Sequence, residues 1–306
     1  MKPVLGRTIR PCRATAAVVG VSALLLGMAS CSSSPSGPQR AKDYYVSVGD
    51  SYAVGYQPSP TPGATSGYTA VVASATHLAL ANFGCAGATT TSLITTPGCT
   101  SPYGPAAASG AVSYPRQSQE QAAEAFLRAH RGHVGLITVT IGGNDITSCS
   151  NRTDLVACFT AAISTIGRNV TTLASALRSA AGAHVPIIGL TYPDVLLGSW
   201  VYPPSSPNHS LATESVTVFK TYVNPALAAA YEKPNATFVD ITAATGAYTP
   251  LTQTTTLAPY GTIPVAVAQV CKLTWYCTHG SIHANDDGYS FIGQQVVQAY
   301  DRSRHA

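Results

Sequence analysis

Short apolar runs alternate along this chain with longer stretches in which apolar residues recur every three or four positions. The short runs predict buried strands at 44–48, 78–83, 134–141, 185–190 and 236–241. The longer periodic stretches predict helices at 67–78, 118–129, 154–181, 213–231 and 286–303. Strands that alternate with helices indicate right-handed βαβ units. We therefore expect an α/β fold, a three-layer α/β/α sandwich with a mainly parallel five-stranded sheet, close to the flavodoxin-like arrangement.

Three regions lack this periodicity, and we expect them to be mostly loop: 90–115, 192–210 and 242–270. The last two, together with 58–63, are expected to shape any pocket at the sheet edge. Residues 43–306 are enough for one large α/β domain, and no internal repeat is visible.

The first 30 residues have the pattern of a secretory signal peptide. A basic leader precedes an uncharged, largely apolar run at 14–28, which is too short to span a membrane comfortably. The run ends in Leu26-Gly27-Met28-Ala29-Ser30-Cys31, which resembles the lipobox of bacterial lipoproteins, although Met28 departs from the commoner leucine. This resemblance predicts export, a lipidated Cys31 that anchors the chain to a membrane, and a flexible tether at 31–42. The alternative is an ordinary cleaved signal with Cys31 incidental.

Removing the leader changes the charge of the protein. The full chain has a formal net charge of +4, and its leader holds four cations and no acidic residue, so the remainder is neutral. A neutral domain has no basic face for nucleic acid, and we expect no nucleic-acid partner.

Beyond Cys12 and Cys31, six cysteines lie in three close pairs along the chain. In an exported protein an even number favours disulfides, although six cysteines allow fifteen connectivities. The clustering favours Cys85–Cys99, Cys149–Cys158 and Cys271–Cys277. A zinc site is less consistent with these spacings, because no pair is Cys-x-x-Cys and no histidine is suitably spaced. We expect no metal.

Four blocks of chemistry-bearing residues are spread over the domain. Gly49-Asp50-Ser51 follows the first strand and offers a hydroxyl, and Gly84-x-x-Gly87 follows the second and offers a backbone N–H. Gly142-x-Asn144-Asp145 follows the third and offers a side-chain amide, and Ile282-His283 offers an imidazole just before the last helix. Nucleophile, base and oxyanion donors are what acyl transfer needs. There is no Gly-x-Ser-x-Gly elbow.

These four blocks, in this order, resemble the GDSL or SGNH hydrolase superfamily over nearly the whole mature domain. The letters S, G, N and H fall on Ser51, Gly87, Asn144 and His283, and His283-x-Asn285-x-x-Gly288-Tyr289 matches the family's stretch beyond the histidine. The three local cysteine pairs look like those of actinobacterial secreted lipases and esterases in this group.

The resemblance implies a serine esterase or lipase that hydrolyses small-molecule or lipid acyl esters without a cofactor. Ser51 would be the nucleophile and His283 the base. The N–H groups of Ser51 and Gly87 and the amide of Asn144 would form the oxyanion hole.

One position departs from the family pattern. The family usually has Asp three residues before the histidine, and here that residue is Gly280. Either a backbone carbonyl near Gly280 accepts the Nδ1–H of His283 in a Ser–His dyad, which we prefer, or another carboxylate substitutes. Asp286 and Asp287 are sufficiently explained as acids at a helix N-terminus, and His279 lacks the Asn-x-x-Gly-Tyr that follows His283.

Two alternatives remain, and only the first uses the same residues for chemistry. An acyltransferase or carbohydrate deacetylase would move the acyl group by the same machinery. A catalytically decayed, envelope-binding lipoprotein is the alternative from another class, and the missing Asp is its one supporting feature.

Overall fold

The computed structural model describes residues 43–58, 63–64, 67–103, 107–149, 153–206 and 209–304, all within the unit Arg40–Ala306. The signal peptide, Cys31 and the tether predicted at 1–42 lie outside the described residues, so the domain boundaries remain predictions. Among the described residues, no helix combines the length and the apolar character that a membrane crossing requires.

A five-stranded parallel sheet forms the centre of the domain. Its strands lie in the order β4-β1-β5-β6-β7, and every neighbouring pair is parallel. Counted along the sequence this is the order 2-1-3-4-5 of flavodoxin-like folds, which confirms the expected fold class. The bounds of the strands are β1 Tyr44–Gly49, β4 Ala79–Asn82, β5 Val134–Thr140, β6 Ile187–Leu190 and β7 Thr237–Val239.

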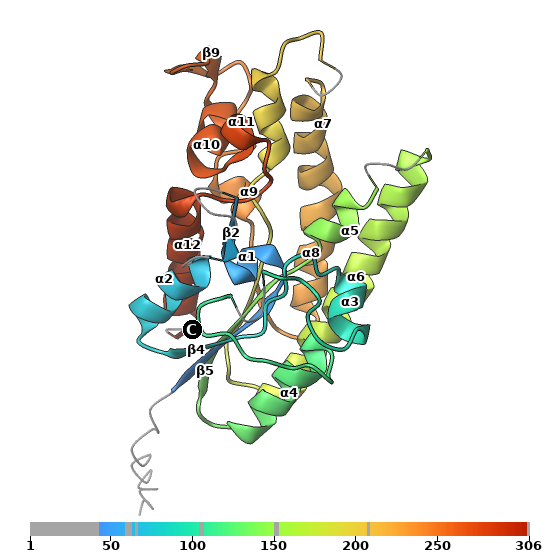
Figure 1. The fold of residues 1–306 in the computed structure, drawn as a ribbon, viewed down its shortest axis with the longest axis vertical. Coiled ribbons are helices and arrows are strands. Elements are labelled where there is room, and N and C mark those ends of the chain that lie inside the picture. Colours follow the sequence, from blue (N-terminus) through green and yellow to red (C-terminus); the bar gives the residue numbers. More distant parts are fainter. Residues whose placement is uncertain are drawn as a thin grey trace, which may run out of the picture. The chain divides into compact units, whose positions relative to one another are not determined.

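Helices cover both faces of the sheet (Figure 1). Leu136 and Ile137 are neighbours on β5, and they pack into different hydrophobic clusters because successive strand side chains point to opposite faces. The cluster around Ile137 includes residues of α4 (Gln119–Ala129), α6 (Leu155–Ala181) and α8 (Asn224–Glu232). The cluster around Leu136 includes residues of α2 (Gly67–Thr76) and α12 (Asp286–Arg304). The three-layer arrangement follows from these two clusters.

The region predicted as a loop at 242–270 is mostly regular structure, so that prediction was wrong. It contains α9 (Ile241–Ala244), the antiparallel hairpin β8 (Thr254–Leu257) and β9 (Gly261–Pro264), and most of α10 (Val265–Leu273). The threonines of β8 are β-branched and favour a strand. Ala266, Val267 and Val270 have helical spacing and pack into a third cluster with Leu197. A short helix, α11 (Tyr276–His279), follows.

The other expected loops also contain helices. The region 90–115 begins with α3 (Thr90–Thr95), whose capping box joins Thr89 and Ser92. The region 192–210 contains a 3₁₀ helix, η1 (Val195–Val201). Short polar side chains at such positions are equally compatible with caps and with turns, and this ambiguity concealed the helix starts.

The single helix expected at 213–231 is divided by a π-helical segment. The structure has α7 (Leu211–Val218), then η2 (Phe219–Val223), then α8, and the N–H of Asn224 reaches back five residues to the carbonyl of Phe219. Pro225, the next residue, has no N–H with which to continue an α-helical ladder. A kink near Asn224-Pro225 was therefore predicted, but its π-helical form was not.

Three disulfides link neighbouring parts of the chain. They are Cys85–Cys99, Cys149–Cys158 and Cys271–Cys277, the pairs that the clustering favours. The second joins the end of α5 (Gly143–Thr147) to the start of α6, and the third joins α10 to α11. Disulfides persist in oxidising compartments, which agrees with export.

Candidate active site

The first strand ends in a glycine that no other residue could replace. Gly49 has φ +153°, and a Cβ built on it would lie 2.2 Å from the carbonyl oxygen of Thr140 at the end of β5. The side chain of Gln119, on α4, also holds this glycine, because it accepts the N–H of Gly49 and donates to its carbonyl. Gln119 is a site residue that sequence reasoning missed, because its partner is 70 positions away.

The strand leads Ser51 directly to the histidine. Ser51 is the first residue of α1 (Ser51–Val54), and its Oγ lies 2.9 Å from Nε2 of His283. His283 stands in the loop between α11 and α12, and the hydroxyl of Tyr52 donates to the neighbouring carbonyl of Ile282 at 2.7 Å. Two segments 232 positions apart are therefore held in hydrogen-bonding contact.

The remaining predicted site residues border the same space. Ser51, Gly87, Asn144 and His283 all line one surface cleft of about 280 Å³. Asn144 Nδ2 donates to the carbonyl of Ala88 at 2.8 Å, which ties its amide to the Gly87 loop and leaves its second N–H available. Gly87 has φ +82°, a conformation that favours glycine.

The hydrogen-bond partner of His283 Nδ1 differs from the one expected. The hydroxyl of Ser281 bonds this nitrogen, with Oγ 3.1 Å from Nδ1, and in the described part of the chain neither a backbone carbonyl near Gly280 nor a carboxylate does so. Gly280 has φ +64° and ends α11, which turns the chain so that the side chain of the next residue reaches the imidazole. The preference for a backbone carbonyl was therefore wrong for this structure.

The residues that could be confused with the base or its partner lie elsewhere. His279 is exposed, its Nδ1 contacts the Thr278 hydroxyl at 2.8 Å, and its ring packs against Trp275. Asp286 accepts a hydrogen bond from Nε2 of Gln57 at 2.6 Å. Asp287 is exposed at the start of α12.

The stretch beyond His283 has a structural reason for each of its matching residues. Asn285 accepts the N–H of Gly288 and so caps the start of α12. A Cβ on Gly288 would lie 2.0 Å from the carbonyl oxygen of Leu273, so only glycine allows this approach. The hydroxyl of Tyr289 donates to the carbonyl of Tyr56 at 2.8 Å. These contacts position the loop that carries His283.

Two further side chains hold the segments that carry Asn144 and follow Gly87, and no motif in the sequence pointed to them. Asp145 accepts both the N–H and the hydroxyl of Thr90, at 2.8 and 2.6 Å, and so connects α5 to the loop that follows Gly87. Tyr192 donates to Asp50 and accepts the N–H of Gly143. Asp145 was noted only as the end of a motif, and Tyr192 only as the start of a loop.

Burial shifts both titratable groups beside Ser51 toward their neutral forms. It lowers the pKa of His283 to about 4, so the imidazole is neutral at pH 7 and able to accept a proton. It raises the pKa of Asp50 to about 7, although hydrogen bonds from Tyr192 and the Tyr52 N–H oppose this shift. Among the described residues, no cluster of three or more His, Cys, Asp or Glu side chains is placed to hold a metal ion.

Comparison with known proteins decides the family. A sequence model of the GDSL-like lipase/acylhydrolase family matches residues 47–291. The chain belongs to this family. The match spans all four blocks of this GDSL-like lipase/acylhydrolase and shows that it is a carboxylic ester hydrolase in general. No curated protein matches it in sequence.

Three solved structures are similar to this GDSL-like hydrolase at low sequence identity. An extracellular lipase from Streptomyces rimosus is 17% identical, with 84% of this chain and 99% of that one covered and a TM-score of 0.48. A phospholipase A1 from Streptomyces albidoflavus is 16% identical, with 67% of this chain and 82% of that one covered and a TM-score of 0.41. A lipolytic protein of the G-D-S-L family from Desulfitobacterium hafniense is 12% identical, with 84% of this chain and 99% of that one covered and a TM-score of 0.42. The family assignment rests on the family model.

Proposed function

We propose that this protein hydrolyses carboxylic esters through a Ser51–His283 centre, with Ser51, Gly87 and Asn144 as the oxyanion hole. The contact of 2.9 Å between Ser51 Oγ and His283 Nε2 is the observation that carries this proposal. It is a hydrogen bond between a nucleophile and a base, the arrangement that activates a hydroxyl.

In the acylation step, Ser51 Oγ attacks the ester carbonyl carbon while His283 Nε2 takes the hydroxyl proton. The carbonyl oxygen becomes an oxyanion that accepts hydrogen bonds from the N–H groups of Ser51 and Gly87 and from Asn144 Nδ2. When the intermediate collapses, the bond to the alcohol oxygen breaks and His283 returns the proton to that oxygen. The products of this step are the free alcohol and an acyl ester on Ser51.

Deacylation repeats the sequence with water as the nucleophile. His283 takes a proton from water, the hydroxide adds to the acyl carbon, and the same donors hold the oxyanion. Collapse releases the carboxylic acid, and the proton on His283 returns to Ser51 Oγ. Every proton is carried by His283, so the step needs a neutral imidazole at its start.

The decisive experiment compares substitutions at the two reacting residues. Ser51→Ala and His283→Ala should each lower kcat for p-nitrophenyl acetate by about 10³-fold or more, with unchanged circular dichroism. His279→Ala is the matched control, because this exposed histidine lies four residues away and should leave kcat unchanged. Intact turnover in either Ser51→Ala or His283→Ala would overturn the assignment.

A second measurement separates this proposal from a decayed site. A fluorophosphonate probe should label the wild-type protein and fail to label Ser51→Ala, because only an activated hydroxyl attacks phosphorus readily. Adding a sugar acceptor to the ester assay should leave the yield of free acid unchanged. A transfer product in place of free acid would favour an acyltransferase.

We also propose that the chain is exported and anchored by a lipid on Cys31. The lipobox-like segment and the three disulfides support this. In a bacterial host fed an alkyne fatty acid, wild type should become labelled and sediment with membranes, whereas Cys31→Ser should be unlabelled. Unlabelled, freely secreted wild-type protein would instead indicate an ordinary cleaved signal peptide.

A further inference from the structure

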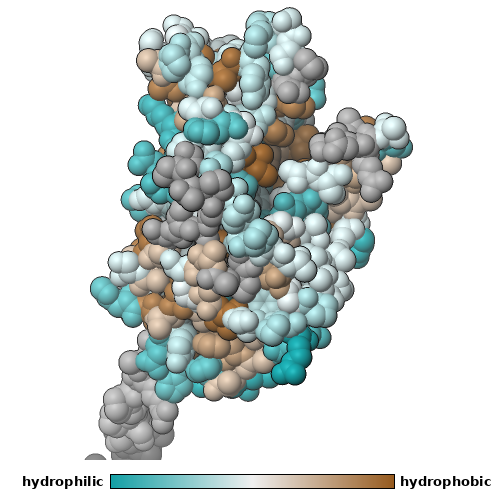
Figure 2. Space-filling model, viewed as in Figure 1, coloured by the Kyte–Doolittle hydropathy of each residue, from teal (hydrophilic) through white to brown (hydrophobic). Residues whose placement is uncertain are grey.

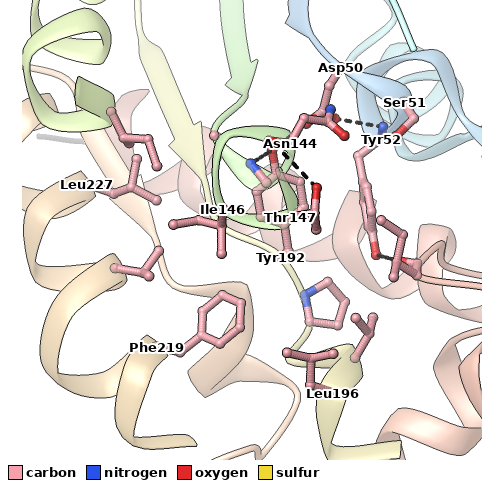
Figure 3. Close-up of a pocket in the computed structure, with 17 residues that line it drawn as sticks. Asp50, Ser51, Tyr52, Asn144, Ile146, Thr147, Tyr192, Leu196, Phe219 and Leu227 are labelled. Atoms are coloured by element: carbon pink, nitrogen blue, oxygen red, sulfur yellow. Dashed lines mark hydrogen bonds between the residues drawn. The ribbon is translucent and has the colours of Figure 1, made fainter. Parts of the chain in front are cut away.

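A small apolar pocket opens beside Ser51, on the side away from the surface cleft that His283 borders. Its volume is about 100 Å³. One wall is made by Ser51 and Asn144, and Figure 3 shows Leu227 and Phe219 on the opposite side of the pocket in that view. The pocket and the cleft share Ser51, Asn144 and Ile282 in their linings. A carbonyl carbon held at Ser51 Oγ would therefore have one substituent directed toward each space.

Several helices contribute the walls of this pocket, and none of the described residues that line it is basic. Ile146 comes from α5, Ile166 from α6, Phe219 and Val223 from η2, and Leu227 from α8. The only acidic lining group, Asp50, is buried and hydrogen-bonded by Tyr192. An uncharged, apolar group is the ligand that such walls favour.

Phe219 lies on the more exposed part of the pocket wall, at the start of the π-helical segment. Ile166, Val223 and Leu227 are almost fully buried, whereas Phe219, like Ile146 and Leu196, is partly exposed. Figure 2 shows apolar surface in a hollow beside α7, on the side that faces α5. Removal of the Phe219 ring would open the pocket to this side without disturbing the central sheet.

On these grounds, and on the basis of the proposed function, we propose that this pocket binds the acyl group and that Phe219 limits it to about four carbons. A volume of 100 Å³ corresponds to roughly three water molecules at about 30 Å³ each. A methylene group is similar in size, so the pocket holds about three carbons beyond the carbonyl carbon at Ser51. The larger and more open cleft, lined by Tyr56 and Tyr103, takes the alcohol.

The test varies only the acyl chain, so that the alcohol side stays constant. For p-nitrophenyl acetate, butyrate, octanoate and palmitate, wild-type kcat/KM should be highest at acetate or butyrate and at least tenfold lower at octanoate, because each excluded methylene costs about 10-fold or more. Phe219→Ala should raise kcat/KM for octanoate at least tenfold and leave kcat/KM for acetate within about twofold of the wild-type value. Tyr222→Ala is the control, since this residue of the same segment is 54% exposed and does not line the pocket.

A second variant works in the opposite direction. Ile146→Phe fills the pocket and should lower kcat/KM for butyrate relative to acetate. This variant tests the proposal even if Phe219→Ala fails to fold. A wild-type preference for octanoate, or an unchanged chain-length profile in both folded variants, would overturn the acyl-pocket proposal while leaving ester hydrolysis intact. No hydrolysis of any ester by folded wild-type protein would overturn the proposed function itself.

A different observation concerns the imidazole. Ser281 Oγ lies 3.1 Å from His283 Nδ1, the ring nitrogen that faces away from Ser51. The other ionisable groups around His283 are the rings of Tyr56 and Tyr52, at 4.5 and 6.0 Å between centroids, and the buried Asp50 beyond Ser51. Asp286 is held by Gln57.

We infer that Ser281 is a positioning residue whose hydroxyl accepts the Nδ1–H and fixes the tautomer that leaves Nε2 free to act as base. A hydroxyl can hold the ring in place, but it carries no charge to stabilise the imidazolium that forms during the reaction. The site therefore works as a Ser–His dyad assisted by a neutral acceptor.

Three substitutions test this role. Ser281→Ala should lower kcat about tenfold or more with little change in KM, and Ser281→Thr should restore most of the loss. Ser281→Asp should move the acid limb of the kcat/KM profile upward by about one pH unit or more, because an adjacent anion favours the imidazolium. Thr278→Ala is the matched control, since it removes the hydroxyl that contacts His279. Wild-type kcat in Ser281→Ala, or an unmoved pH profile in active Ser281→Asp, would overturn the inference.

Discussion

The hydroxyl of Tyr192 lies 2.6 Å from Oδ2 of Asp50, and this pair joins two of the blocks that form the site. The same hydroxyl accepts the backbone N–H of Gly143 at 3.2 Å. Asp50 precedes Ser51, the proposed nucleophile, and Gly143 precedes Asn144, the proposed oxyanion donor. One buried tyrosine thus fixes the segment of Ser51 relative to the segment of Asn144.

Tyr192→Phe should therefore lower activity by more than its effect on folding explains. The substitution leaves Asp50 Oδ2 and the Gly143 N–H without their shared partner, and a small displacement of reacting groups can cost up to about 10²-fold. We expect kcat to fall roughly 10-fold to 100-fold with a smaller change in KM. Tyr276→Phe is the control, because Tyr276 is also buried and its hydroxyl contacts Ser199 at 2.9 Å, away from the site. Equal kcat losses in both variants would contradict a specific role for Tyr192.

Asn144→Ala should affect the transition state more than substrate binding. If the amide donates to the oxyanion, its loss should lower kcat by about 10²–10³-fold with KM nearly constant. Gln298→Ala provides a control, because it removes an exposed side-chain amide of α12. Steady-state kinetics on p-nitrophenyl acetate measure both variants, and a loss confined to KM would show that Asn144 binds substrate without stabilising the oxyanion.

The pH dependence of kcat/KM should reflect the burial of His283. The base must be neutral, and burial lowers its pKa to about 4. His283 should therefore cause no loss of activity from pH 7 down to about pH 5 and an acid limb as the pH drops through about 4, where the imidazole becomes protonated. Assays with an ester that has no ionisable group isolate this effect from substrate titration, and Asp50→Asn removes the ionisation of Asp50, whose pKa burial raises to about 7. In Asp50→Asn, an acid limb centred at or above the ordinary histidine value of about 6.5 would contradict the prediction.

The sequence predicted the parts of the site that depend on strand ends. Ser51, Gly87 and Asn144 each follow a buried strand of one parallel sheet, and parallel strands bring their carboxyl ends to the same edge. Ser281 was missed because its contact depends on the left-handed turn at Gly280. Tyr192 was missed because its partner Asp50 is 142 positions away, and no local pattern records that contact.

The apolar pocket also could not be predicted from the sequence. Two of its wall residues, Phe219 and Val223, lie in the π-helical segment, where the α-helical register is interrupted. Helical periodicity assumes 3.6 residues in every turn and so places such side chains wrongly. The motifs therefore predicted which residues line the cleft, whereas the shape of the apolar pocket came from packing.

The stability of the fold should depend on pH through Asp194, a carboxyl group outside the catalytic residues. Asp194 is fully buried at the start of η1, and neither of its oxygens has a partner of hydrogen-bonding geometry, although Ser215 and the Leu196 and Leu197 N–H groups lie near enough to restrain its pKa. Burial raises that pKa to about 7, above the unfolded value of 3.8. The folded state therefore retains a proton that the unfolded state releases, and this stabilisation is lost as the pH rises through about 7.

Asp194→Asn removes the ionisation and should flatten this dependence. Relative to the variant, wild type should lose about 2 kcal/mol of unfolding free energy between pH 5 and pH 8, since each unit of pKa difference corresponds to about 1.4 kcal/mol. Urea unfolding at the two pH values measures the difference, and Asp301→Asn, at an exposed position near the end of α12, controls for loss of a surface charge. A wild-type stability that runs parallel to that of Asp194→Asn between pH 5 and pH 8 would show that the buried carboxylate is already ionised in the folded protein at pH 5.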